Sequence, residues 1–147
     1  MSPVDYIVNV EGAIVHEGRY LLVIRGNGET HAAGMLSLVG GKVENAGNTA
    51  NILEETLRRE VHEEVGVEIG DMIYVHSTAF VSDDNKSVVD VVFLCRWIMG
   101  EPIIRDSDEV AAIRWMTANE ILTNPDAPEW TRSSVRRAEK MRNLLGW

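Results

Sequence analysis

The sequence predicts one domain that is either α+β or a sandwiched α/β fold with a mixed sheet. Three observations lead to this class. β-Branched, apolar segments lie on both sides of one amphipathic helical segment, a second helical pattern closes the chain, and no linker, repeat or low-complexity tract divides the 147 residues. Such segments bury their apolar faces by packing helices onto a sheet. Residues 1–147 are expected to form a single domain, because the chain is too short for two domains of typical length.

The strands are indicated by runs of β-branched and apolar side chains bounded by turn residues. They cover residues 6–16, 19–25, 35–41, 72–81, 87–99 and 109–116. The first two runs meet at Glu17 and Gly18, and the fourth and fifth flank the turn SDDNK, so each of these pairs is expected to form a hairpin. The third run ends at the glycine pair Gly40 and Gly41.

Capping patterns predict where the central helix and a short later helix begin. Asn51 followed by Glu54 has the spacing of a capping box, and Gly66 is a typical residue for the end of the same helix. Thr117 followed by Glu120 has the same capping-box spacing before a short apolar run.

The last helix is expected between Pro128 and Gly146, which are typical start and stop residues. Its apolar residues recur at helical spacing and are expected to pack on the body: Trp130, Val135, Ala138, Met141 and Leu145. Its basic residues are Arg132, Arg136, Arg137, Lys140 and Arg142. We interpret this basic set as a solvated face, with phosphate binding as the alternative.

The composition narrows the expected partners and location. The chain has 14 Lys and Arg against 23 Asp and Glu, which argues against nucleic acid as a partner. A metal ion can nevertheless bring a phosphorylated small molecule to an acidic protein. No segment approaches the ~20 apolar residues of a membrane span, so we expect no membrane partner and a cytoplasmic protein. Cys95 is the only cysteine, and its apolar neighbours indicate a buried core residue.

The central helix carries three clustered carboxylates, Glu60, Glu63 and Glu64. At about 100° per residue, Glu64 projects about 40° from Glu60, inside an apolar stripe that runs from about 20° at Leu53 to about 140° at Val65. Burying a carboxylate without a partner is costly, and a bound cation would offset that cost. Oxygen ligands without a thiol or a histidine pair suit Mg²⁺ or Mn²⁺. We expect a metal site, with an ordinary acidic helix edge as the alternative.

The residues around these acids resemble the signature of the Nudix hydrolases, G-x5-E-x7-R-E-U-x-E-E-x-G-U, in which U is apolar. The second half matches at every specified position: Arg59, Glu60, Val61, Glu63, Glu64, Gly66 and Val67. The first half departs from the signature, because residues 42–58 separate Gly41 from Arg59 and contain about four residues more than the signature allows. The three residues that could occupy the place of the first glutamate are Gly47, Asn48 and Asn51.

The resemblance implies a Nudix-type α/β/α sandwich with a mixed sheet, a central helix carrying the signature and a C-terminal helix. It also implies hydrolysis of a nucleoside diphosphate linked to another group, by water that Mg²⁺ (or Mn²⁺ in its place) activates. The implied metal ligands are Glu60 and Glu64, Glu63 directly or through water, and the carbonyl group of Gly40 or Gly41. Arg59 would hold the carboxylates in place through ion pairs.

A general base, or a carboxylate that orients the water, is also needed. Glu109, just before the last strand, best matches the acid that some members of the family place there. Asp106 and Asp108 are alternatives, and an ordinary polar loop is the non-catalytic interpretation. Arg25 and Lys42 are expected to contact phosphate, with a surface role as the alternative for Arg25.

The expected substrate is a small-molecule nucleotide. Markers that some subfamilies carry for ADP-ribose and NADH include prolines, and no proline occurs between Val67 and Glu101. This favours a nucleoside triphosphate or another nucleotide. The alternative function is a non-catalytic sensor domain that binds a nucleotide, although such domains tend to lose the acids that this chain keeps. An isoprenoid diphosphate isomerase would need a cysteine in the site, for which Cys95 is a poor candidate. The family also often forms homodimers.

Overall fold

Within residues 4–29 and 32–147, which the computed structural model describes, seven strands form one mixed sheet. The strands are β1 (Ile7–His16), β2 (Arg19–Arg25), β3 (Leu36–Ser37), β4 (Val39–Lys42), β5 (Glu68–Val81), β6 (Ser87–Met99) and β7 (Val110–Met116). The helices are α1 (Ile52–Val65), α2 (Ala118–Leu122) and α3 (Glu129–Leu145).

The parallel pair β1 and β6 lies at the centre of the sheet. β1 also pairs antiparallel with β2 and with β4. β5 pairs antiparallel with β6, and β2 pairs antiparallel with both β3 and β7. Both predicted hairpins are present. The first turns at Glu17 and Gly18, which both have positive φ, 51° and 75°, as a tight two-residue hairpin turn requires.

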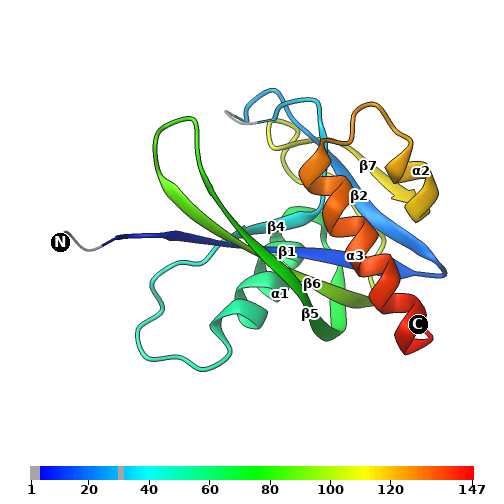
Figure 1. Cartoon of the computed structure of the whole chain (residues 1–147), viewed down its shortest axis with the longest axis horizontal. Helices are drawn as coiled ribbons and strands as arrows, with labels where there is room; N and C mark the ends of the chain where they lie inside the picture. The colour runs from blue at the N-terminus through cyan, green and yellow to red at the C-terminus, as the bar shows by residue number, and fades with distance from the viewer. Residues whose placement is uncertain (1–3, 30–31) are drawn as a thin grey trace.

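Helices cover the two faces of the sheet, so the predicted α/β sandwich is confirmed (Figure 1). Val10 and Ile14 of β1 belong to the apolar core beneath α1. The alternate residues Ala13 and Val15 belong to the core beneath α3. Successive side chains of a strand point to opposite faces, so β1 contributes to both cores at once.

α1 begins directly after Asn51, as predicted, but two other expectations about local structure are wrong. Asn51 has left-handed backbone angles (φ 56°, ψ 38°) and its side chain makes no capping bond, so no capping box forms with Glu54. A capping box needs an extended backbone at the capping residue. The expected strand over residues 35–41 is two short strands, because Leu38 lies in neither of them. By contrast, Gly66 ends α1 as predicted, and its N–H donates to the carbonyl of His62.

The C-terminal helix begins after Pro128 and ends before Gly146, as predicted. Trp130 and Leu145, however, are 53% and 44% exposed and do not belong to its buried face. Small polar residues take that face in the first turns. The Thr131 hydroxyl donates to the carbonyl of Leu36 (3.0 Å), and the Ser134 hydroxyl hydrogen-bonds to His76 (3.0 Å).

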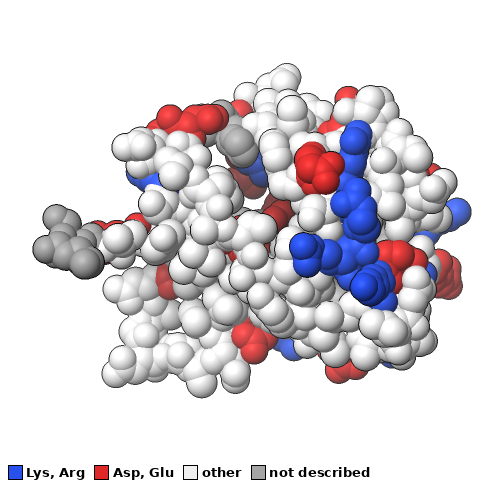
Figure 2. Space-filling view, in the orientation of Figure 1, with Lys and Arg blue, Asp and Glu red and all other residues white. Residues whose placement is uncertain are grey.

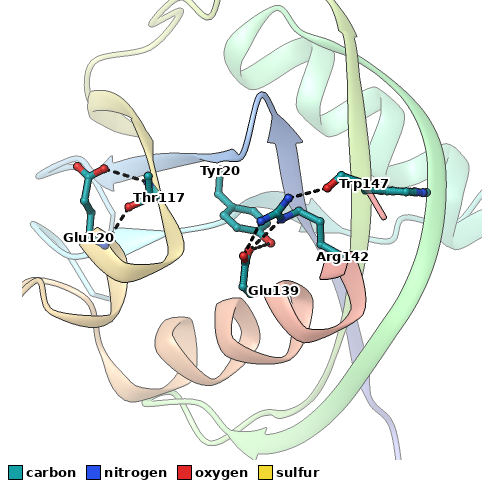
Figure 3. A network of polar contacts seen from close by, with 6 residues as sticks. All are labelled: Tyr20, Thr117, Glu120, Glu139, Arg142 and Trp147. Atoms are coloured by element: carbon teal, nitrogen blue, oxygen red, sulfur yellow. Dashed lines mark hydrogen bonds and ion pairs between the residues drawn. The ribbon is translucent and has the colours of Figure 1, made fainter. Parts of the chain in front are cut away.

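The basic residues of α3 divide into two groups. Arg136, Arg137 and Lys140 are exposed, and Figure 2 shows a basic stripe along this helix. Arg142 instead belongs to a partly buried network: it pairs with Glu139 (2.6 Å) and donates to the backbone carbonyl of Trp147 (2.5 Å) (Figure 3). Arg132 is also partly buried and donates to the backbone carbonyl of Asn124 (2.9 Å). The interpretation as a wholly solvated face is therefore wrong for Arg132 and Arg142.

Cys95 is fully buried, as predicted. No helix in the described part of the chain is long and apolar enough to cross a membrane.

Candidate functional site

The acids of α1 are positioned by its apolar residues. Leu57, Val61 and Val65 are fully buried against the sheet and fix the rotation of the helix. Glu64 therefore projects on the inner side and is largely buried, in the direction that helical periodicity predicts. Within the residues that the structure describes, the carboxylate of Glu64 makes no hydrogen bond or ion pair.

The carboxyl group of Glu64 lies close enough to other acidic side chains for their charges to raise its pKa. Burial first, and then the charges of Glu109 and Glu60, raise the pKa of this carboxyl to about 8, although the nearby charge of Arg25 lowers it. The protein thus brings Glu60 and Glu109 close enough to Glu64 to repel its carboxylate, and among the described residues Glu64 has no hydrogen-bonding partner. A bound cation would relieve this repulsion.

Glu60 lies beside the backbone of β4 and is ion-paired to its neighbour in sequence. The Arg59 guanidinium lies 3.1 Å from Glu60 and 3.3 Å from Glu63, so one cation bridges two carboxylates. Burial nevertheless raises the pKa of Glu60, because the opposing effect of Arg59 is smaller. Glu63 is exposed on the outer side.

The glycine pair allows the backbone to approach these acids closely. A side chain at Gly41 would begin 2.3 Å from the carboxyl carbon of Glu60, and one at Gly40 would begin 1.9 Å from the carbonyl oxygen of Val10. Either substitution would displace neighbouring atoms. Only glycine leaves β4 both paired with β1 and close to the acids of α1.

Glu109 lies in the loop before β7, and of the neighbouring charges it has the largest electrostatic effect on the Glu64 carboxyl. The pKa of Glu109 is itself raised, first by burial and then by Asp106 and Glu29. The neighbouring acids have other contacts: Asp106 accepts the Asp108 N–H (2.9 Å) within the turn, and the Asp108 carbonyl accepts a backbone N–H from Gly28 (2.9 Å).

The two predicted phosphate-binding residues differ in their surroundings. Arg25 ends β2, pairs with Glu29 (2.9 Å) and is close enough to Glu64 to lower its pKa. Lys42 ends β4, is exposed and lies opposite Asn9 of β1. Arg25 is therefore gathered with the acids, whereas Lys42 lies at their periphery.

The sequence reading did not single out two further acids, Glu11 of β1 and Asp90 of β6. Asp90 is 8% exposed and accepts a hydrogen bond from the Asn9 amide (2.9 Å). Glu11 hydrogen-bonds to Asp90, and burial followed by this carboxylate raises the pKa of Glu11 well above its usual range. A signal for both was present, because each interrupts an otherwise apolar strand, in NVEGAIV and SVVDVVF.

The donor set fits a hard divalent cation. In the part of the chain that the structure describes, no three acidic, histidine or cysteine side chains already converge as a closed ligand cluster. The side chains of Glu60 and Glu64, with the β4 backbone alongside, nevertheless provide oxygen donors only, and their negative charge is incompletely compensated. Oxygen donors of this kind suit Mg²⁺ or Mn²⁺ rather than a soft metal.

Residues 7–138 match a family model described as NUDIX domain. The MutT protein from Methanosarcina mazei Go1 is 27% identical and covers 97% of this chain and 99% of its own, with a TM-score of 0.77. The MutT NUDIX hydrolase from Burkholderia pseudomallei is 26% identical, with coverages of 90% and 98% and a TM-score of 0.76. At 18% identity, the NUDIX domain of Shewanella oneidensis NrtR, complexed with ADP ribose, covers 96% of this chain and 89% of its own (TM-score 0.71). No curated protein matches the chain.

Proposed function

This chain belongs to the NUDIX domain family and is a Nudix hydrolase, and from that premise we propose that it uses Mg²⁺ to hydrolyse a nucleoside diphosphate linked to another group. The observation that supports a metal-dependent reaction is the buried carboxyl of Glu64, which has no hydrogen-bond or ion-pair partner among the described residues and is close enough to Glu60 and Glu109 to be affected by their charges. Glu60, Glu64 and the carbonyl of Gly40 or Gly41 would hold the cation, with Glu63 as an outer ligand. Mn²⁺ fits the same donors.

Bound Mg²⁺ would neutralise the diphosphate and lower the pKa of a coordinated water molecule. The other roles belong to the protein's own side chains. Glu109 orients the attacking water and accepts its proton, Arg25 contacts the phosphate oxygens, and Lys42 adds a peripheral positive charge. Arg59 keeps the carboxylates of Glu60 and Glu63 oriented through its two ion pairs.

The test is phosphate or pyrophosphate release from a panel of nucleoside triphosphates and dinucleotides, with Mg²⁺ and with a chelator. We expect Glu64→Gln to lower kcat/KM by about 100-fold or more, because the isosteric amide keeps the shape but loses the charge that holds the cation. Glu55→Gln is the matched control, since Glu55 is exposed on the same helix. Activity that survives both the chelator and Glu64→Gln would contradict the proposal.

A second candidate function is nucleotide binding without hydrolysis. It is favoured by the absence of a glutamate at the three positions that could replace the first acid of the signature, Gly47, Asn48 and Asn51. It also agrees with the NrtR domain, which is seen with ADP ribose bound. Tight binding of one panel member without turnover, in the presence of Mg²⁺, would establish this second function in place of the first.

A further inference from the structure

The strands at the borders of the sheet differ in how well they are protected from pairing with another chain. Within the described residues, β3, β4, β5 and β7 each pair with a single other strand. β3 and β4 are only two and four residues long, and β7 carries the charged residue Arg114. Short strands and charged side chains both disfavour pairing at an edge. β5 is 14 residues long, so it presents the longest edge of the four.

The two halves of β5 are protected unequally. Over residues 68–76 the register with β6 shifts three times, and Asp71 adds a negative charge. Such irregularities bend an edge strand and oppose pairing with another chain. Over residues 77–81 the register with β6 is regular, and all five residues are exposed. We name residues 77–81 the edge segment.

The edge segment has the composition of a strand and carries no charge. Its sequence is STAFV, and residues 72–81 contain no Asp, Glu, Lys, Arg or Pro. Phe80 and Val81, which point to opposite faces of the strand, are 45% and 64% exposed. The tip of the β5–β6 hairpin projects away from the helices (Figure 1). The outer backbone N–H and C=O groups of the edge segment are therefore accessible to another strand.

The charge of the protein indicates where two copies can meet. The net charge is −9, so like charge opposes contact between two copies over much of the surface. The uncharged edge segment avoids this repulsion. An edge strand is also self-complementary, because a two-fold axis through its middle residue pairs it antiparallel with the same strand of another copy. We propose that the protein forms a homodimer by antiparallel pairing of two edge segments, with the two-fold axis at Ala79.

This register places compatible residues opposite each other. Ala79 lies opposite the partner's Ala79, and its small side chain allows the two strands to approach. Thr78 lies opposite the partner's Phe80, and Ser77 opposite the partner's Val81. Five residues from each copy bury less area than a standard interface, so we expect a weak dimer with a Kd on the order of 10–100 µM. The dimer does not depend on the proposed hydrolysis.

Sedimentation equilibrium tests the association. Between about 1 µM and 1 mM protein, the average mass should rise from 16.4 kDa toward twice that value. Ala79→Lys places two like charges on the axis and should raise Kd by about 10-fold or more. Ala79→Val adds no charge and should keep the dimer. Leu144→Lys is the matched control, because it adds the same charge at a position of α3 that is 81% exposed.

Cross-linking through cysteine tests the register. Opposed Cα atoms of an antiparallel pair are about 4.5–5.5 Å apart, which a disulfide can span. Ala79→Cys should therefore give a covalent dimer under mild oxidation. Ser77→Cys alone should not, because two such residues lie four positions apart along the strands, about 13 Å. A mixture of Ser77→Cys and Val81→Cys should cross-link again. Cys95 is fully buried and does not take part.

The outcomes are distinct. An average mass of 16.4 kDa at every concentration would overturn the proposal. So would a dimer that Ala79→Lys does not weaken and that Ala79→Cys does not cross-link, because it would use another surface. Circular dichroism verifies that each variant folds, and the cysteine variants decide the register if Ala79→Lys does not fold.

Discussion

Two partly buried sites that contain carboxyl groups differ in how the protein compensates the negative charge. The acidic site, formed by Glu60, Glu64 and Glu109, buries Glu64 without a hydrogen-bond donor among the described residues, and the pKa of Glu64 rises to about 8. The C-terminal network, formed by Tyr20, Glu139, Arg142 and Trp147, surrounds its one carboxylate with donors (Figure 3). There the Arg142 guanidinium lowers the pKa of Glu139 despite partial burial.

The difference separates a binding function from a structural one. Glu139 receives hydrogen bonds from the Tyr20 hydroxyl (2.6 Å) and from Arg142 (2.6 Å), so its charge is compensated within the protein. Among the described residues the carboxyl of Glu64 has neither kind of contact, and the charges of two other acids, Glu109 and Glu60, act on it. Its compensation must come from a ligand, which is why a cation is expected there and not in the C-terminal network.

The largest effect is expected from loosening α1, which carries the acidic site. Leu57 is fully buried between α1 and the sheet. Leu57→Ala should lower the free energy of unfolding by about 2–5 kcal/mol, because the cavity adds to the lost apolar burial. Urea denaturation measures it. Leu144→Ala is the control, since Leu144 is 81% exposed and its loss should cost no more than about 0.5 kcal/mol. Equal effects of the two substitutions would contradict the assignment of Leu57 to the core.

The next largest effect is expected in the pH dependence of the free energy of unfolding, through the protonation of Glu64. In the unfolded chain this group ionises near 4.5, whereas in the folded protein it keeps its proton up to about pH 8. The folded state binds more protons in that window, so the metal-free protein should lose stability as the pH rises from about 4.5 to 8.

Glu64→Gln should remove that loss and raise the stability of the metal-free protein at pH 8 by about 1–3 kcal/mol. Thermal unfolding of both proteins in chelator, across this pH range, measures it. Identical pH profiles for wild type and Glu64→Gln would mean that Glu64 is not held in its protonated form.

Glu139→Gln should have the opposite sign and a smaller size. The folded-state pKa of Glu139 is lowered, so its contribution is present above the unfolded-state value near 4.5 and is lost as the pH falls below it. At pH 7 the substitution should cost about 1 kcal/mol, because solvent screens a partly exposed pair. The cost should shrink toward pH 3. Denaturant titrations at pH 7 and pH 3 measure both values, and a cost that is the same at the two would contradict the ion pair.

The sequence allowed the architecture to be predicted largely where local chemistry determines it. The ends of α1 and α3 follow from Gly66 and Gly146, and the direction of Glu64 follows from helical periodicity. The pairing of Glu11 with Asp90 did not follow, because it depends on the parallel register of β1 and β6 and joins residues far apart in the chain. Turn geometry fixes the register of a hairpin, but β1 and β6 are not joined by a turn.

The smallest expected changes in the free energy of unfolding come from substitutions at the helix caps. One cap, like Glu139, has its hydrogen bonds satisfied within the protein, whereas the other does not. Thr117 has a complete capping box with Glu120: its hydroxyl accepts the Glu120 N–H, and the Glu120 carboxylate accepts the Thr117 N–H, both at 3.2 Å (Figure 3). Thr117→Ala should therefore cost about 1 kcal/mol.

Asn51 precedes α1 with a left-handed backbone and no side-chain cap, so Asn51→Gly removes no capping bond and relieves the left-handed strain. Its effect on the free energy of unfolding should be within about 0.5 kcal/mol of zero. Chemical denaturation of the two variants beside wild type compares them directly. If Asn51→Gly cost as much as Thr117→Ala, the Asn51 side chain would cap α1 after all. The backbone N–H groups at the start of α1 would then be hydrogen-bonded as fully as those of α2.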